Sequence, residues 1–176
     1  SGVTLFRMGE EGVPKVEEYV EEQLEKGGCI GFDGRVMDAK AGKKYAEIAE
    51  KKEGSLYVTE DLVDIIWTER PSLPAHKVWI LEQEYAGMST EEKLSQVREQ
   101  MKQEGADVHI LASLYDIAWL LNLRGDDIDH VPVFLSFVAV EEKKTTLFIN
   151  QEILDDKVKK YLKDNQVQVE DYEKIY

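Results

Sequence analysis

The sequence predicts an α/β fold built on a mixed β-sheet with flanking helices. Short apolar runs typical of strands alternate with longer amphipathic patterns typical of helices, which is the order found in sheets with crossover helices. Glycines and capping residues separate the segments. Two strand patterns near the C-terminus are joined by only Glu141 to Lys144, which favours an antiparallel hairpin and makes the sheet mixed.

The first seventy residues alternate between strand and helix patterns. Apolar residues recur at helical spacing from Val13 to Lys26, and Gly27 and Gly28 end that pattern. Asp38 is placed to cap the next helix, which Gly54 ends. The predicted elements are strand Val3–Met8, helix Val13–Lys26, strand Cys29–Phe32, helix Asp38–Glu53, strand Ser55–Thr59 and helix Asp61–Trp67.

A proline-rich segment, Arg70–His76, divides the chain, because proline disfavours helix at its own position and at the one before it. We therefore expect two domains, residues 1–74 and 75–176. In the second, Ser89 and Glu92 form a capping-box pattern. The predicted elements are a helix from Ser89 to Glu104, strand Val108–Ala112, helix Ser113–Leu121, strands Val131–Val140 and Thr145–Ile149, helix Gln151–Lys163 and strand Val167–Tyr172.

Charge and composition exclude several classes of partner. The chain has 36 acidic and 22 basic residues, a net charge of −14, so nucleic acid and anionic membrane would be repelled. No run of about 18 apolar residues could span a bilayer, and no signal-peptide pattern opens the chain. The single cysteine, Cys29, allows no internal disulfide, which favours a reducing compartment and a cytoplasmic location.

Motifs for metal or cofactor chemistry are absent from the sequence. His76, His109 and His130 are scattered and have no zinc-ligand spacing. Cys29 lies in an apolar run without a histidine nearby, so we expect a buried and unreactive thiol. No glycine pattern matches a phosphate-binding loop. We therefore assign no catalytic residue, no metal ligand and no cofactor to this chain.

The segment from Tyr115 to Phe137 carries the strongest functional pattern. An apolar helix ends at a polar turn, and an apolar strand follows, so charged groups would project from a rigid base. Asp126, Asp127 and Asp129 could hold a hard cation such as Mg²⁺ or form a solvated turn, and we favour the turn. Arg124 could pair with these aspartates or reach a carboxylate outside the domain, and the residues alone favour neither.

Two segments identify a resemblance to a known family. LVDIIWTERP at Leu62–Pro71 and DIAWLLNLRGDDIDHVPVFLSF at Asp116–Phe137 resemble the non-catalytic domains of long-form, three-domain Xaa-Pro aminopeptidases. The resemblance implies two creatinase/prolidase N-terminal domains with ribonuclease-H-like topology, the first incomplete at its start. It also implies a C-terminal pita-bread domain, absent here, that holds two divalent metal ions, usually manganese, and removes an N-terminal residue preceding proline.

This resemblance makes the Asn122–His130 turn our candidate for the face toward the catalytic domain or the substrate entrance. The residues concerned are Asn122, Arg124, Asp126 and His130, with Arg124 orienting an acidic group and His130 offering a hydrogen bond. The implied partners are the chain's own catalytic domain, a second copy in a homodimer, and a peptide with proline second. Two alternatives stay open: a free-standing binding or scaffold module, and a divalent-cation enzyme using Asp126, Asp127 and Asp129.

Overall fold

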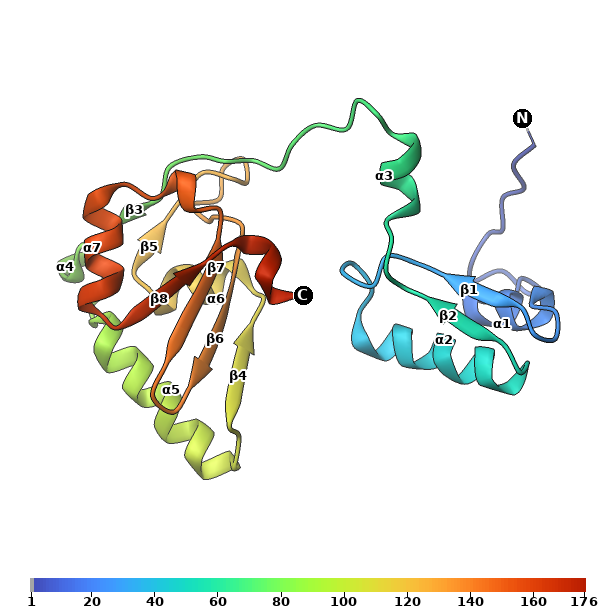
Figure 1. The fold of residues 1–176 in the computed structure, drawn as a ribbon, viewed down its shortest axis with the longest axis horizontal. Coiled ribbons are helices and arrows are strands. Elements are labelled where there is room, and N and C mark those ends of the chain that lie inside the picture. The colour runs from blue at the N-terminus through green and yellow to red at the C-terminus, as the bar shows by residue number, and fades with distance from the viewer. Residues whose placement is uncertain (1) are drawn as a thin grey trace. The chain divides into compact units, whose positions relative to one another are not determined.

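The computed structural model describes residues 2–176 and separates them into two units, Ser1–Pro71 and Ser72–Tyr176. Figure 1 shows both units as ribbons with their elements labelled. The sequence places a domain boundary after residue 74, whereas the units meet between Pro71 and Ser72. Both positions lie in the proline-rich connector, where few backbone groups can join a helix or a sheet.

The first unit is a single β-α-β arrangement with additional short helices. Its strands β1 and β2 pair in parallel, and helix α2 makes the crossover between them. Asp38 caps α2 by accepting a hydrogen bond from the Ala41 backbone N–H at 3.0 Å, as its sequence pattern predicts. The elements are α1 (Val16–Gln23), β1 (Cys29–Gly31), α2 (Ala39–Lys51), β2 (Ser55–Tyr57) and α3 (Leu62–Ile66).

Two expectations for this unit are wrong. Val3–Met8 has no regular secondary structure, although its composition is that of a strand. A strand needs a hydrogen-bonding neighbour, and none of the described strands pairs with this segment. Cys29 is exposed rather than buried, because the two-stranded sheet covers too little surface to enclose it.

The second unit contains a four-stranded mixed sheet in the order β4-β6-β7-β8 (Figure 1). β4 with β6 and β6 with β7 pair antiparallel, while β7 and β8 pair in parallel. The predicted hairpin is confirmed, and Glu141 and Lys144 close its turn. The strands of this sheet are β4 (Val108–Leu111), β6 (Ser136–Glu141), β7 (Thr145–Ile149) and β8 (Val167–Glu170). Two further strands, β3 (Trp79–Ile80) and β5 (Leu123–Arg124), pair antiparallel as a separate two-stranded sheet.

Helix α5 (Thr90–Glu104) of this unit begins and ends at the capping signals of the sequence. Ser89 and Glu92 form the predicted capping box, with the Ser89 N–H donating to the Glu92 carboxylate at 2.9 Å. Gly105 ends the same helix in the left-handed conformation. The helices are α4 (Gln83–Ala86), α5 (Thr90–Glu104), α6 (Leu114–Leu120), the 3₁₀ helix η1 (Gln151–Ile153), α7 (Asp156–Asp164) and the 3₁₀ helix η2 (Tyr172–Ile175).

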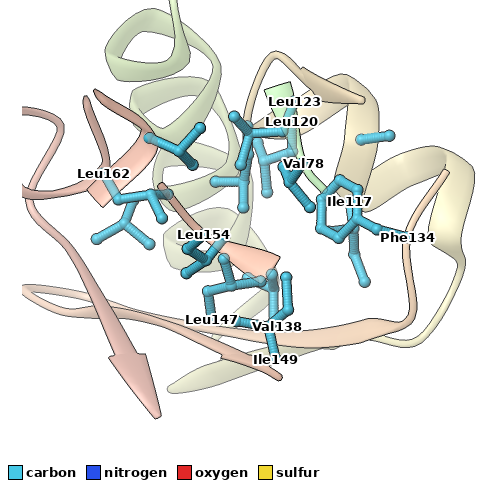
Figure 2. Packing of buried hydrophobic residues seen from close by; sticks show 14 of the residues in the cluster. Val78, Ile117, Leu120, Leu123, Phe134, Val138, Leu147, Ile149, Leu154 and Leu162 are labelled. Carbon is cyan, nitrogen blue, oxygen red and sulfur yellow. The ribbon is translucent and has the colours of Figure 1, made fainter. Parts of the chain in front are cut away.

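One hydrophobic core lies between the sheet and α5, α6 and α7. Alternate residues of β6 point into it, as their burial pattern shows. β7 adds buried side chains beside them in the same sheet, and the three helices supply the side chains that pack against the sheet. Figure 2 shows ten of the contributing residues together: Val78, Ile117, Leu120, Leu123, Phe134, Val138, Leu147, Ile149, Leu154 and Leu162. The other face of the sheet carries Phe137, whose ring contacts Tyr172 and Tyr176 at the C-terminus.

The structure corrects several predicted boundaries here. The strand expected over Val131–Val140 begins only at Ser136, because the residues before it fold against the preceding turn. The helix expected over Gln151–Lys163 is divided into η1 and α7, since Asp155 caps a new helix. β3, α4 and β5 are too short to give a periodic pattern, and the sequence did not predict them. None of the helices in residues 2–176 has the length and apolarity needed to cross a membrane.

Candidate functional site

The candidate site is the loop between α6 and β6, residues 121–135, which we call the site loop. It folds back on itself: the Gly125 and Asp127 N–H groups donate to the carbonyls of Pro132 and Val133 at 3.4 and 3.1 Å. A Cβ atom at Gly125 would lie 2.8 Å from Cβ of Phe134 and 3.0 Å from the Val133 carbonyl oxygen. Glycine is therefore required there by the close approach of the two arms of the loop.

Asn122 is buried and does not face outward as the sequence suggested, being only 2% exposed. It has a positive φ of 50°, a conformation that asparagine tolerates better than most residues. Its Oδ1 accepts a hydrogen bond from Lys93 Nζ at 2.6 Å, and its Nδ2 donates to the Met88 carbonyl at 2.8 Å. Asn122 thus joins the end of α6 to α5 and the loop before it.

Lys93 is the partner of Asn122 and is itself 1% exposed. Its ammonium group donates to the Trp119 carbonyl at 2.7 Å and lies 4.3 Å from the centre of the Trp119 ring. Burial, together with the nearby charge of Arg124, lowers the pKa of Lys93. The C-terminal end of a helix carries partial negative charge, so this end of α6 offsets part of the cost of burying the cation.

Arg124 also caps the end of α6. Its Nη1 donates to the carbonyl oxygens of Ala118 and Leu123 at 2.7 and 2.8 Å. Within residues 2–176 no carboxylate forms an ion pair with it, so the interpretation that it pairs with its own aspartates is wrong. The guanidinium has further N–H donors on Nε and Nη2, and these have no partner within the part of the chain that the structure describes.

The three aspartates of the loop do not converge. The Asp127 side chain is fully buried, and its oxygens accept hydrogen bonds from the backbone N–H groups of His76 and Leu135 at 3.0 and 2.8 Å. Asp126 and Asp129 are exposed. The expectation of a solvated turn is therefore wrong for Asp127. In residues 2–176 no group of three His, Cys, Asp or Glu side chains is placed to hold a metal ion.

His130 lies at the exposed tip of the loop with a φ of 65°, directly before the short β-bridge partner Val131. Of the four residues predicted from the sequence, Asp126 and His130 are exposed, Arg124 is half-buried and Asn122 is buried. The loop therefore presents a cation with spare donors, a carboxylate and an imidazole on a rigid base. These groups can form hydrogen bonds and ion pairs with another surface, but they do not form a catalytic set with a nucleophile and an adjacent base.

Lys93 and His76 belong to the site although neither was predicted from the sequence as a site residue. A signal for Lys93 existed, because it lies three residues after Thr90 and four before Val97, on the face of α5 that is turned inward. No local pattern marks His76, because its contact with Asp127 spans 51 positions in the sequence.

Comparison with known proteins identifies the domain family of this chain. A family model described as the creatinase/prolidase N-terminal domain matches residues 69–176. The chain therefore belongs to the creatinase/prolidase N-terminal domain family, and the resemblance drawn from the sequence is confirmed. The mixed sheet with flanking helices is the predicted fold class, and this too is confirmed.

The chain is similar along nearly its whole length to two curated proteins. The chain is 38% identical over 174 residues to a probable Xaa-Pro aminopeptidase P of Ajellomyces dermatitidis, covering 98% of this chain and 28% of that protein. It is 36% identical over 175 residues to the probable Xaa-Pro aminopeptidase P of Botryotinia fuckeliana, covering 98% and 27%. The chain thus spans little more than a quarter of the length of these curated relatives.

The chain is also similar to a solved structure. The crystal structure of X-prolyl aminopeptidase from Caenorhabditis elegans, described as a cytosolic enzyme with a di-nuclear active site, matches with a TM-score of 0.89 and 31% sequence identity. The match covers 98% of this chain and 28% of that one.

Proposed function

We propose that this chain is the non-catalytic N-terminal region of a longer metal-dependent Xaa-Pro aminopeptidase, an enzyme that removes an N-terminal residue preceding proline. The observation that carries the proposal is likeness along 98% of the chain to proteins of that name, each several times longer. Such a region shapes access to a catalytic centre and contributes to contacts between subunits. Residues 1–74 would be the later part of one creatinase-type domain, and residues 75–176 a second.

The geometry of the site loop supports a contact role and not a chemical one. Its backbone is fixed by Gly125, Asn122 and Asp127, so the groups that it exposes are held in place. Arg124 has donors left over after capping α6, and a guanidinium recognises carboxylates through two parallel hydrogen bonds. We propose that Arg124 orients an acidic group of the catalytic segment or the carboxylate of a peptide, with Asp126 and His130 beside it.

The metal ions of the proposed enzyme would be held elsewhere in the longer protein. No residue of this chain is proposed as a ligand, and the oxygens of Asp127 are engaged by the backbone N–H groups of His76 and Leu135. The C. elegans relative is described as having a di-nuclear site, and we propose two divalent ions, with manganese as the first to test. We also propose a location in the cytoplasm, because that relative is described as cytosolic. The homodimer expected from the family resemblance remains a proposal.

Activity measurements test the non-catalytic role directly. The 176-residue polypeptide, incubated with Mn²⁺ and a peptide that has proline second, should release no first residue above the buffer rate. Metal-dependent release by this polypeptide would contradict the proposal. The gene's reading frame is the complementary test, because a frame that encodes no metal-binding domain would favour a free-standing binding module instead.

Substitution in the longer enzyme tests Arg124. Arg124→Ala should raise KM or weaken assembly, and Arg124→Lys should recover only part of the loss, because lysine keeps the charge but lacks the planar fork. Arg98 is the matched control: it lies on α5 and also donates to a backbone carbonyl, that of Glu141 at 2.9 Å. Equal effects of Arg98→Ala and Arg124→Ala would reduce the role of Arg124 to structural support.

A further inference from the structure

Asp127 joins two segments of the second unit that are distant in sequence. Its Oδ1 accepts the N–H of His76 in the connector, and its Oδ2 accepts the N–H of Leu135 at the end of the site loop. The carboxylate is fully buried, and these two hydrogen bonds compensate the loss of its hydration. The start of the unit and the site loop therefore depend on the same side chain.

The same carboxylate also contacts the imidazole ring of His76. Oδ1 of Asp127 lies 3.3 Å from Nδ1 of His76. The Asp127 carboxylate accepts two backbone N–H groups, and its oxygen would repel a lone pair on Nδ1 at this distance, so the contact favours the hydrogen on Nδ1. In a neutral imidazole the other nitrogen, Nε2, then keeps its lone pair. The His76 side chain is 61% exposed, and the ring atom in contact with Asp127 is Nδ1, which leaves Nε2 for other partners.

We infer that Asp127 is a positioning residue, which holds His76 of the connector against the site loop with the hydrogen on Nδ1. Nε2 of His76 is then presented as a hydrogen-bond acceptor. A carboxylate that sets the tautomer of a histidine from behind is the arrangement found in metal sites and catalytic triads. Here it would give the surface a directed acceptor for an N–H or O–H group, such as an ammonium or guanidinium, on a facing surface. The identity of that surface as the rest of the enzyme rests on the proposed function, whereas the tautomer does not.

Nuclear magnetic resonance of the 176-residue polypeptide, labelled with ¹⁵N in histidine, tests the tautomer. The ¹⁵N shifts, followed as the pH is raised until they no longer change, identify which ring nitrogen carries the hydrogen in the neutral form. His76 should be protonated at Nδ1, unlike His109 and His130, and Asp127→Ala should remove this preference. Asp126→Asn, a change at the exposed neighbour, should leave it intact. A His76 ring protonated at Nε2, or one unaffected by Asp127→Ala, would overturn the inference.

Hydrogen exchange tests the positioning separately from folding. Asp127→Asn retains one acceptor oxygen, so one of the two amides of His76 and Leu135 should exchange at least about tenfold faster while the other stays protected. The Val138 amide in β6 should exchange at its original rate, which shows that the unit remains folded. Unchanged exchange at both amides would contradict the role of Asp127.

Substitution of His76 in the longer enzyme tests whether its Nε2 accepts a hydrogen bond from a facing surface. His76→Ala should raise KM or weaken assembly, and His76→Gln should recover part of the effect, because the glutamine side chain offers an acceptor oxygen. Unchanged values would show that Nε2 meets no partner. They would leave the aminopeptidase activity itself in place, so this failure is distinguishable from failure of the proposed function.

Discussion

Replacement of the buried Lys93 by methionine is the most informative perturbation of the site. Methionine has a similar length, so the volume is kept while the ammonium group is lost. Two charge-assisted hydrogen bonds, to the Trp119 carbonyl and to Asn122 Oδ1, disappear, each worth about 1.5–3 kcal/mol. The contact with the Trp119 ring adds roughly 0.5–2 kcal/mol.

The opposing term is the desolvation of the charge, which costs several kcal/mol for a buried ion. The sum is a net destabilisation of about 1–3 kcal/mol, because Asn122 Oδ1 is left buried without a donor and the Trp119 carbonyl keeps a long hydrogen bond from the Asn122 N–H at 3.4 Å. Chemical denaturation, followed by a probe in the second unit, measures it, and the exposed Lys102→Met on the same helix is the control. A Lys93→Met variant as stable as the original would refute the reasoning, since it would mean that the buried ammonium contributes nothing.

A double-mutant cycle tests whether the hydrogen bond between Lys93 and Asn122 accounts for the stabilisation by Lys93. Asn122→Gly keeps the positive φ that the backbone needs and removes the acceptor of Lys93. If the hydrogen bond between them carries the effect, the double variant should be less destabilised than the sum of the single variants by about 0.5–3 kcal/mol. Exact additivity would place the stabilisation of Lys93 on the Trp119 carbonyl and ring instead.

Three further outcomes are expected. The lowered pKa of Lys93 means that the unfolded chain binds the proton more tightly, so between the folded pKa and the ordinary lysine pKa of 10.5 its contribution to stability rises with pH; the difference in stability between the original and Lys93→Met should follow that sign in pH-dependent denaturation, and a constant difference would contradict it. Gly125→Ala should cost about 1–3 kcal/mol in the same assay, because the added Cβ would collide with Phe134; Gly42→Ala in α2, where the added atom meets nothing closer than 3.8 Å, should be neutral or stabilising when unfolding of the first unit is followed, and equal effects would disprove the steric argument. Leu147→Ala at the centre of the sheet should cost about 2–5 kcal/mol, against less than about 0.5 kcal/mol expected for a substitution at an exposed site, and a small effect would mean that the core is not packed as described.

Local signals in the sequence determined much of the architecture. The caps at Asp38 and Ser89 and the stop at Gly105 depend on atoms within four residues, so the sequence states them directly. The hairpin between β6 and β7 follows from strand patterns separated by a short polar turn. The family could also be identified from the sequence, because the motif at Asp116–Phe137 is long and its residues follow the family's order.

The strand expected at Val3–Met8 shows the limit of local information. Its composition is suited to a strand, but a strand exists only when another lies within hydrogen-bonding distance. The late start of β6 has a similar cause: Val133 and Phe134 are apolar, yet they pack into the core and against Gly125 and are not paired with β7.

The sequence by itself determined the helix caps, the hairpin, the fold class and the position of the site loop, because each rests on neighbours along the chain or on the order of elements. Only the tertiary structure decided that Asp127 is internal, that Lys93 is buried and that His76 belongs to the site. Their hydrogen bonds join residues 29 and 51 positions apart, and burial at such distances depends on how the elements pack. An aspartate-rich turn that read as solvated therefore proved to contain the carboxylate that holds the loop together.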